Sequence, residues 1–401
     1  MREYQVSIGS EACGNRNSAV PRLRVALLAG SLSRGGAEKQ LFYIARALFE
    51  LGVDVRVYSV TRGEPYEENL KAVGIPVHWF GRLGNPLLRV ATLAMLLRSH
   101  RPHVIQAGNA FTNLYAAILG RWFNAMSLGA HRSSWAHARQ RNGIWTYPLM
   151  KAPSAVIANS ERAMLEFTSR RILRPESVRV LPNAIDLDEY RAAETQTDTQ
   201  SAAFPREPVA IFVARLIAVK RLDRFLRAFS LASKQVPGLK GIVVGEGPER
   251  KPMQQLAQEM GLSSRVSFLG ERHDVGALLQ NARFLVLSSD WEGTPNVILE
   301  AMAAALPVIT TPVGDVAEIV VDGVTGSVVG FDDVQGMAAR IVELARSPQL
   351  CRQLGVAGRN HVRRRHGLDG LGERLLAIYR DIARQQENDQ VVRLLPERAR
   401  T

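Results

Sequence analysis

The chain has 401 residues, of which 46 % are hydrophobic and 22 % are charged, a composition typical of a soluble protein with two domains of ordinary size. It contains no run of eighteen or more uncharged apolar residues, and residues 1–21 lack the apolar core of a signal peptide, so we expect no membrane-spanning or secretory segment. Its two cysteines, Cys13 and Cys351, exclude a disulfide framework or a cysteine metal site and favour a cytoplasmic location.

The formal net charge of +13 is unevenly distributed along the chain. Residues 1–200 hold 25 Lys and Arg against 16 Asp and Glu, whereas residues 201–401 hold 26 against 22. The segment 82–160 contains nine basic residues and no acidic one. Such a field attracts an anionic membrane, a phosphorylated acceptor or nucleic acid. We expect peripheral contact with an anionic membrane at its cytoplasmic face, with an arginine-rich proteome as the alternative explanation.

The first part of the chain predicts an α/β domain. Residues 1–21 have the composition of a flexible leader, and residues 22–190 alternate short apolar strands with amphipathic helices. The loop at 30–36 joins the first strand to the first helix, and its Gly35 and Gly36 stand where a backbone approaches a ligand closely. A tight turn is the alternative. The spacing matches neither a dinucleotide fingerprint nor a Walker A loop.

His131 follows the strand predicted at 126–130 and therefore stands at its carboxyl end. Ligands of open α/β sheets bind at that end, although a lone histidine is more often structural than catalytic. The next residues, 132–151, mix aromatic and basic side chains without an acidic one. This pattern suits contact with a membrane interface, stacking on nucleic-acid bases or a plain solvated helix.

Residues 191–207 are polar and predict a linker, after which residues 208–366 repeat the alternation of strands and helices. Arg215 and Lys220 follow the first strand of this second domain. Two cations at the carboxyl end of a strand suit a diphosphate, because arginine offers a bidentate fork and lysine a point charge. A solvated charged loop is the alternative. Gly245 ends the next strand in a tight turn.

A strand, a polar turn and a helix near residue 295 combine a helix N-terminus with two acids. We predict Thr294 as the N-cap, Pro295 as the first helical position and residues 296–305 as the helix. The unpaired N–H groups at such a terminus bind phosphate, and the carboxylates of Glu292 and Glu300 accept hydroxyl groups. The alternative is that both acids serve only the helix dipole and the surface.

These residues together resemble the nucleotide-sugar site of glycosyltransferase family 4. The matching positions, in chain order, are Gly35-Gly36-Ala37-Glu38-Lys39, His131, residues 182–186, Arg215 with Lys220, Glu292-Gly293, Leu299-Glu300-Ala301, Pro307-Val308, and Gly314 with Glu318. A pair of acids eight residues apart is a weak signal alone, whereas the ordered set across both halves is a specific one.

The resemblance implies an α/β fold of the GT-B type, with two facing Rossmann-like, doubly wound domains and a cleft between them. Residues 22–190 would then bind the acceptor, and residues 208–366 would bind the nucleotide sugar. Residues 367–386 would form a helix that crosses back to the first domain. Residues 387–401 have the composition of a charged tail.

The resemblance also implies a retaining glycosyltransferase that moves a sugar from a UDP- or GDP-linked donor to a lipid-linked or polysaccharide acceptor. Arg215, Lys220 and the helix N-terminus would stabilise the departing diphosphate in place of a metal, so we expect neither metal nor other cofactor. The catalytic positions would be His131, Glu292, Arg215 and Lys220. The donor-binding positions would be Gly35, Gly36, Arg215, Lys220, Gly245, Gly293, Thr294, Pro295, Asn296 and Glu300.

Two other functions fit parts of the sequence. A nucleotide-sugar epimerase of the same fold would release an epimer or free sugar without an acceptor. A non-catalytic nucleic-acid-binding protein would fit the positive charge, but it would not need Glu292 and Glu300. We therefore do not expect a nucleic-acid partner.

Overall fold

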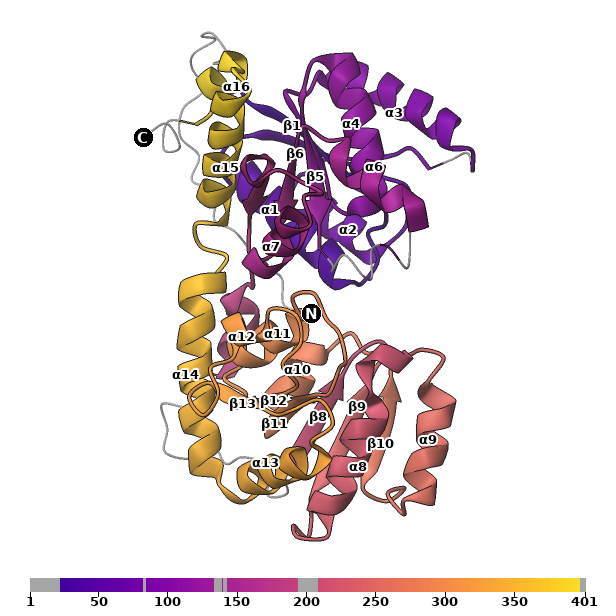
Figure 1. Cartoon of the computed structure of the whole chain (residues 1–401), viewed down its shortest axis with the longest axis vertical. Coiled ribbons are helices and arrows are strands. Elements are labelled where there is room, and N and C mark those ends of the chain that lie inside the picture. The colour runs from indigo at the N-terminus through magenta and orange to yellow at the C-terminus, as the bar shows by residue number, and fades with distance from the viewer. Residues whose placement is uncertain (1–21, 82–83, 133–138, 140–142, 194–207, 397–401) are drawn as a thin grey trace, which may run out of the picture.

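The computed structural model describes residues 22–81, 84–132, 139, 143–193 and 208–396, and these fold into two domains stacked along the long axis of the molecule (Figure 1). The predicted leader and most of the predicted linker lie outside the described residues. Among the described residues, no helix has both the length and the apolarity needed to cross a bilayer.

The first domain is built on a parallel sheet that helices cover on both faces. Its strands are β1 (Arg24–Ala29), β2 (Asp54–Ser59), β3 (Val77–Trp79), β4 (Val104–Ala107), β5 (Met126–His131), β6 (Ala155–Ala158) and β7 (Val178–Val180). Its helices are α1 (Gly36–Glu50), α2 (Pro65–Ala72), α3 (Pro86–His100), α4 (Asn113–Phe123), α6 (Thr146–Lys151) and α7 (Glu161–Ser169), with short 3-10 turns η1 (Ala110–Thr112), η2 (Gly143–Trp145), η3 (Pro175–Ser177) and η4 (Leu187–Ala193).

The second domain repeats this plan. Its strands are β8 (Val209–Val213), β9 (Lys240–Val244), β10 (Val266–Gly270), β11 (Phe284–Leu287), β12 (Val308–Thr310) and β13 (Gly326–Val328). Its helices are η5 (Ala218–Lys220), α8 (Leu222–Ser233), α9 (Arg250–Glu259), α10 (Val275–Gln280), α11 (Asn296–Ala303), α12 (Val316–Ile319), α13 (Val334–Arg346) and α14 (Pro348–His366), followed by α15 (Leu371–Gln385) and α16 (Asp389–Leu394).

Both sheets are doubly wound. The strand order is β3-β2-β1-β4-β5-β6-β7 in the first and β10-β9-β8-β11-β12-β13 in the second, with every pair parallel. The order reverses between β1 and β4 and again between β8 and β11. In such sheets ligands bind beyond the carboxyl ends of the strands at the reversal point. The topology therefore points to the loops after β1 and β8 as the place for a site.

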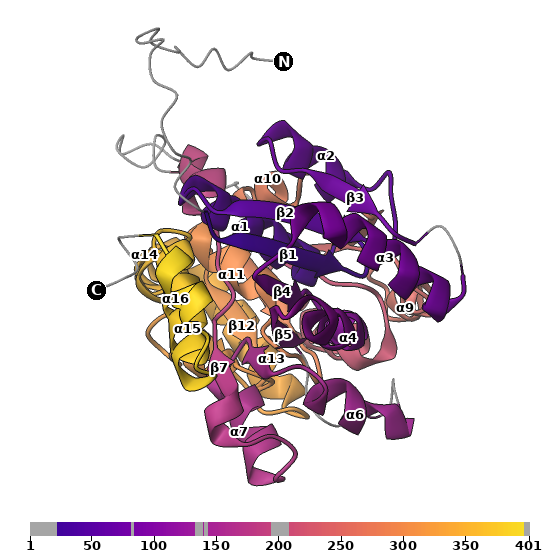
Figure 2. The ribbon, with the colours of Figure 1, turned by 90° about the horizontal axis from the view of Figure 1, so that it is seen from above.

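Helix α15 returns from the second domain to the first. Its Leu375, Tyr379 and Ile382 are buried in the same apolar cluster as Ile44 and Leu48 of α1. Figures 1 and 2 show α15 beside the first sheet, while α14 runs along the second domain. The last helices thus bind the two domains together through apolar burial, which is the main favourable contribution to folding.

Two expectations were wrong, one about the C-terminal residues and one about where a helix ends. Residues 387–401 are not simply a charged tail, because α16 forms within them and buries Val391 and Leu395 against the first domain. The helix predicted at 296–305 ends two residues earlier, at Ala303, because Ala305 adopts a left-handed backbone with φ of 55°. Such a residue ends a helix by turning the chain away from its axis.

Acid is expected to destabilise the first domain through His103. The Nδ1 atom of His103 accepts a hydrogen bond from the backbone N–H of Arg24 at 3.0 Å, and burial, followed by the nearby charge of Arg24, lowers the pKa of His103 to about 4. Between about 6.5 and about 4 the unfolded chain binds a proton that the folded chain does not, so the free energy of unfolding falls as pH falls through this window.

The loss attributable to His103 is about 1–2 kcal/mol after allowance for solvent screening. Urea unfolding at pH 7 and pH 4.5 measures it. The variant His103→Asn keeps an acceptor near the Nδ1 position but does not titrate, so its stability should change less between the two pH values. An equal change in both proteins would show that His103 is not responsible.

Candidate active site

A cavity of about 1090 Å³ lies between the two domains, at the carboxyl ends of β8, β9 and β11. The first turn of α1 closes it from the first domain, and the first turns of α11 border it from the second. The cavity therefore occupies the reversal point of the second sheet, where the topology predicts a ligand. Of the twelve predicted site residues, the lining includes Gly35, Gly36, Arg215, Lys220, Gly245, Glu292, Thr294, Pro295, Asn296 and Glu300.

The N-terminus of α11 faces the cavity, but its cap differs from the predicted one. Pro295 occupies the N-cap position, and Asn296 is the first helical residue. The hydroxyl of Thr294 donates to the Asp315 carboxylate and accepts a hydrogen bond from the side-chain amide of Asn159 at 3.0 Å. Thr294 therefore joins the two domains instead of capping α11, and no described side chain caps the first N–H groups of the helix.

Glu292 and Lys220, two of the predicted catalytic residues, form an ion pair with each other. The Nζ atom of Lys220 lies 2.6 Å from both carboxylate oxygens of Glu292, and the Ser289 hydroxyl donates to one of them at 2.7 Å. Glu292 is buried, with 8 % of its surface exposed. An incoming diphosphate can therefore reach the charge of Lys220 only by sharing it with Glu292.

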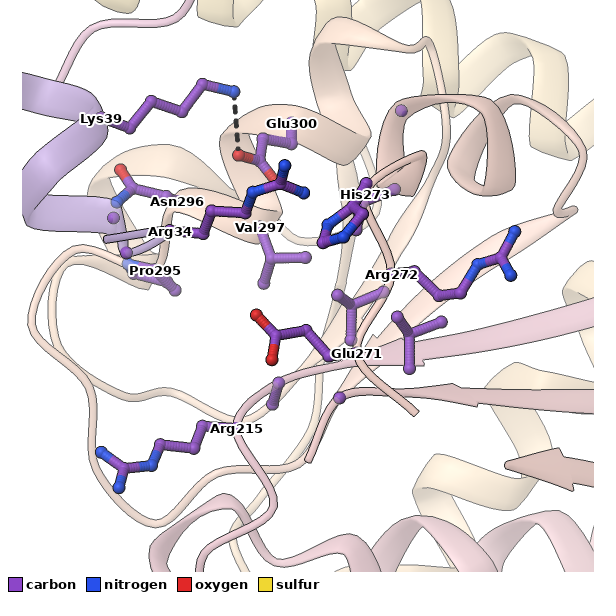
Figure 3. A pocket seen from close by; sticks show the side chains of 18 of the residues that line it. Arg34, Lys39, Arg215, Glu271, Arg272, His273, Pro295, Asn296, Val297 and Glu300 are labelled. Carbon is purple, nitrogen blue, oxygen red and sulfur yellow. Dashed lines mark hydrogen bonds and ion pairs between the residues drawn. The ribbon is translucent and has the colours of Figure 1, made fainter. Parts of the chain in front are cut away.

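Arg215 and Arg34 are cations of the cavity lining whose guanidinium groups are not paired with an acidic residue that the structure describes. Both are exposed, and neither guanidinium group has a hydrogen bond or ion pair to any residue that the structure describes. Arg215 follows β8 in the second domain, and Arg34 precedes α1 in the first, so the two domains each contribute one (Figure 3). A guanidinium group binds phosphate oxygens through paired N–H groups. Their placement suits a diphosphate held between the domains.

Glu300 is paired across the cleft with Lys39 of α1. The Nζ atom of Lys39 lies 3.2 Å from one oxygen of Glu300 and 3.1 Å from an oxygen of Glu189 (Figure 3 draws the first pair). Burial opposes the charge of Lys39, yet the nearby carboxylate of Glu300 and the surrounding groups raise the pKa of Lys39 above its ordinary value. Lys39 is therefore charged at neutral pH, and its ammonium group faces the Glu300 carboxylate.

The first turns of α1 and α11 are packed directly on each other. A Cβ atom at Gly36 would lie 2.0 Å from the side-chain nitrogen of Asn296, so any larger residue there would displace the Asn296 side chain. The side-chain oxygen of Asn296 accepts hydrogen bonds from Asn183 at 2.9 Å and from Gln40 at 3.4 Å, both in the first domain. The sequence-based expectation of a close backbone approach at Gly36 thus has a structural reason, namely contact between the domains.

Gly245 holds two loops of the cavity together. It follows β9 with φ of 131°, a backbone conformation that other residues rarely adopt, and its N–H donates to the carbonyl of Gly270 at 2.7 Å. A Cβ atom at this position would lie 1.9 Å from the carbonyl oxygen of Ala214. Gly245 therefore allows the turn that carries Arg215 to pass against the end of β9.

Two predicted site residues do not line the cavity. His131 ends β5, is 2 % exposed, and packs its ring 3.9 Å from that of Phe167, centroid to centroid. Gly293 lies behind the lining, where a Cβ atom would meet the carbonyl oxygen of Arg132 at 2.9 Å. Residues 133–138, which follow His131, lie outside the described residues. The catalytic role of His131 stays a prediction.

Sequence reasoning missed several residues of the site. Lys39 stands in the Gly-Gly-Ala-Glu-Lys string, in which the sequence predicts only the two glycines to bind the donor. Glu271, Arg272 and His273 follow β10 and line the cavity, and Figure 3 shows the Glu271 carboxylate pointing into its open centre. Their position after a strand was the available signal, since loops at carboxyl strand ends form the crevice. Glu189 gave no signal, because it lies in the segment that joins the domains.

One acidic motif in the sequence bears on the expectation that the reaction needs no metal. Asp186 and Asp188 have the D-x-D spacing of a metal-binding motif. Neither residue lines the cavity, because Asp186 pairs with Arg46 at 2.9 Å and its other oxygen accepts the backbone N–H of Asp188 at 3.1 Å. Throughout the part of the chain that the structure describes, no three His, Cys, Asp or Glu side chains are grouped as metal ligands would be.

Comparison with known families decides what kind of chain this is. The family model described as Glycosyltransferase Family 4 matches residues 34–189, and the model described as Glycosyl transferases group 1 matches residues 194–361. The chain belongs to glycosyltransferase family 4. Each model includes one side of the cavity, since the first contains Lys39 and the second contains Arg215 and Glu300.

Individual relatives agree with this assignment. The family 4 chain is 27 % identical over 239 residues to N-acetyl-alpha-D-glucosaminyl L-malate synthase of Bacillus anthracis, covering 59 % of this chain and 62 % of the relative. It is 35 % identical over 151 residues to the putative glycosyltransferase EpsD of Bacillus subtilis, covering 38 % and 40 %. These curated relatives are thus matched over less than two thirds of their length.

A solved structure supports the fold over nearly the whole chain. HepE of Anabaena in complex with UDP-glucose aligns with a TM-score of 0.76 and 23 % identity, covering 91 % of this chain and 99 % of HepE. The family 4 chain therefore has the GT-B fold that the sequence predicts, with two Rossmann-like domains around a cleft.

Proposed function

We propose that the protein is a retaining glycosyltransferase that moves a sugar from a nucleoside-diphosphate sugar to a lipid-linked or polysaccharide acceptor. The observation that carries this proposal is the composition of the interdomain cavity. Arg34 and Arg215, whose side chains form no ion pair with a described residue, line it from opposite domains together with the N-terminus of α11 and the Glu300 carboxylate. Membership in family 4 supports the reaction class, and the UDP-glucose bound by HepE supports a UDP-linked donor.

The reaction separates a diphosphate from an oxocarbenium-like sugar, and the cavity is suited to the negative charge that develops. Arg34, Arg215 and the N–H groups at the start of α11 would stabilise the departing diphosphate. The helix fixes its N–H groups before the reaction, so they need little reorganisation in the transition state. We propose that they replace a divalent metal.

The two glutamates would have separate roles on the donor. The Glu300 carboxylate accepts hydroxyl hydrogens and suits the two hydroxyls of the ribose, while Glu292 lies deeper, beside Lys220, and suits the transferred sugar. Lys220 holds the Glu292 carboxylate in place and can also contact the phosphate nearest the sugar. In this proposal His131 helps to position the sugar from the first domain.

The test is turnover of a panel of sugar nucleotides in the presence of EDTA, with and without a lipid extract as acceptor. Transfer of the sugar with its anomeric configuration unchanged, as read by proton NMR of the product, supports the proposal. Release of an epimer or of free sugar in the absence of any acceptor would instead identify a nucleotide-sugar epimerase. A requirement for divalent metal would contradict the metal-independent part.

We also propose that the first domain rests on an anionic membrane surface at the cytoplasmic face. Exposed large apolar side chains gather on three neighbouring helices of this domain, Leu87, Leu88 and Met95 on α3, Leu114, Ile118 and Trp122 on α4, and Ile144, Trp145 and Tyr147 on η2 and α6. Figures 1 and 2 both show these helices on the side of the domain away from α15 and α16. We call them the α3–α4–α6 face.

The charge of this face suits an anionic bilayer. All three helices lie in the segment 82–160, which has no acidic residue. Each has a basic residue in its last turn, Arg98 in α3, Arg121 in α4 and Lys151 in α6. Apolar side chains flanked by cations are the pattern of surfaces that lie in the headgroup region of a membrane.

Vesicle sedimentation tests the α3–α4–α6 face. The double variant Trp122→Ser and Trp145→Ser is expected to bind phosphatidylglycerol-containing vesicles about tenfold more weakly, because each tryptophan no longer buries apolar surface in the bilayer. The matched control is Val356→Ser, which removes an exposed apolar side chain from α14. Equal binding of the wild type to neutral and anionic vesicles, or an unaffected double variant, would contradict this part of the proposal.

A further inference from the structure

Lys39 connects three parts of the molecule inside the cleft. It comes from the first turn of α1, and its ammonium group lies between Glu300 of α11 and Glu189 of η4. Only 15 % of its side chain is exposed, and its Nζ atom lies 5.7 Å and 5.8 Å from the ring centroids of Tyr43 and Tyr190. The ammonium group is thus surrounded by carboxylates and aromatic rings and has little contact with water.

The ion pair between Lys39 and Glu300 leaves one of the two carboxylate oxygens of Glu300 available to a ligand. Lys39 binds one oxygen, Oε1, at 3.2 Å, and the other oxygen has no hydrogen bond to a residue that the structure describes. Glu300 lines the cavity on the helix whose N-terminus faces the same space. Since each carboxylate oxygen accepts two hydrogen bonds, Glu300 can bind two hydroxyls while it stays paired with Lys39.

Glu189 anchors Lys39 from the other side. The hydroxyl of Tyr43 donates to one oxygen of Glu189 at 3.0 Å, and Lys39 binds the other. Without the ammonium group, the carboxylates of Glu189 and Glu300 would face each other with no cation between them. Like charges that face each other repel, so the two side chains would turn apart. Lys39 therefore determines the direction of Glu300.

We propose that Lys39 is a positioning residue for donor recognition, which orients Glu300 toward the ribose hydroxyls of the nucleotide. Because Lys39 belongs to the first domain and Glu300 to the second, the ribose subsite is complete only when the domains are closed. Donor recognition is in this way coupled to closure. This inference rests on the proposed function, since it assumes that a nucleoside diphosphate occupies the cavity.

The test compares nucleotides with and without ribose hydroxyls. Calorimetry is done with UDP and GDP and with their 2′,3′-dideoxy forms on the wild type and on Lys39→Met. For the ribonucleotide that the wild type binds, Lys39→Met is expected to lower affinity about tenfold, as for loss of a charged hydrogen bond. For its dideoxy form the loss is expected to stay below about threefold, because no hydroxyl contacts Glu300. The control is Lys71→Met, which removes an exposed lysine paired with Glu67.

Three outcomes would overturn the inference. An equal loss for both forms of the nucleotide would mean that Lys39 supports only the fold or the closed arrangement. Tighter binding of the ribonucleotide by Lys39→Met would mean that Lys39 competes with the ribose for Glu300. If the wild type binds neither UDP nor GDP, the proposed function fails together with the inference. In the other two outcomes the nucleotide binds and only the inference fails.

A second variant keeps the test decisive if Lys39→Met does not fold. Glu189→Gln weakens the outer anchor of Lys39 at a side chain that is 43 % exposed, so the protein should tolerate it. The expected result is again a loss that is larger for the ribonucleotide than for the dideoxy form. The same loss for both would overturn the inference.

Discussion

Replacing Arg215 by methionine is expected to lower kcat by about 10²–10³, the usual effect of removing one group that stabilises charge in a transition state. The free energy of unfolding should remain within about 0.5 kcal/mol of the wild type, as for a surface substitution away from packed features. The Arg215 side chain is exposed and has no hydrogen bond or ion pair within the described chain, so its loss leaves no partner behind. The substitution should therefore lower activity without lowering stability.

The matched control is Arg272→Met. Arg272 lines the same cavity and is also exposed, but its guanidinium is paired with Asp274 at 2.7 Å, and Figure 3 shows it pointing away from the open centre. Its loss should change kcat by less than about tenfold. If Arg215→Met and Arg272→Met had equal effects on kcat, the charge of Arg215 would have no special role in the reaction.

The substitution Gly245→Ala is expected to lower the free energy of unfolding by about 2–6 kcal/mol and to reduce donor binding. Backbone strain contributes about 1–3 kcal/mol, because the φ of 131° is confined almost entirely to glycine. Overpacking contributes a similar amount, since the new Cβ atom meets the carbonyl oxygen of Ala214, which is backbone and cannot rotate away. Moving Ala214 also moves Arg215, so affinity falls together with stability.

Gly261→Ala separates strain from overpacking. Gly261 also has a positive φ, of 70°, but a Cβ atom there would meet nothing within 4 Å. We expect it to cost about 1–2 kcal/mol, the usual penalty of a left-handed residue. Urea unfolding of both variants measures the difference, and a loss for Gly245→Ala no larger than that for Gly261→Ala would contradict the close contact with Ala214.

The fold and the location of the site were predictable because they depend on local patterns. Apolar strands alternate with amphipathic helices in both halves, and this alternation specifies parallel, doubly wound sheets. Arg215 and Gly245 follow strands directly, so their place at the carboxyl edge of the sheet comes from the topology. The helix that carries Glu300 was predicted from its proline, although its cap was not.

The ion pairs of the site were not predictable, because they join residues far apart in the chain. Lys39 and Glu300 are separated by 261 positions, and Lys220 and Glu292 by 72. Local pattern gave Lys220 and Glu292 separate roles, whereas the structure pairs them. Thr294 looked like a helix cap because of its position, but Asp315 binds its hydroxyl instead. Such partners depend on how the two domains pack, which no local spacing specifies.

The ligand expected in the cavity provides the most direct test of this account. UDP, GDP, ADP and NAD are compared by calorimetry without divalent metal. We expect one of the three nucleoside diphosphates to bind with micromolar affinity. Glu300→Ala should weaken that binding by about 1.5–3 kcal/mol through loss of charged hydrogen bonds. The exposed Glu259 of α9 provides the control, since Glu259→Ala should leave affinity unchanged. Binding of none of these compounds, or equal affinity for wild type and Glu300→Ala, would contradict a nucleotide-sugar site between the domains.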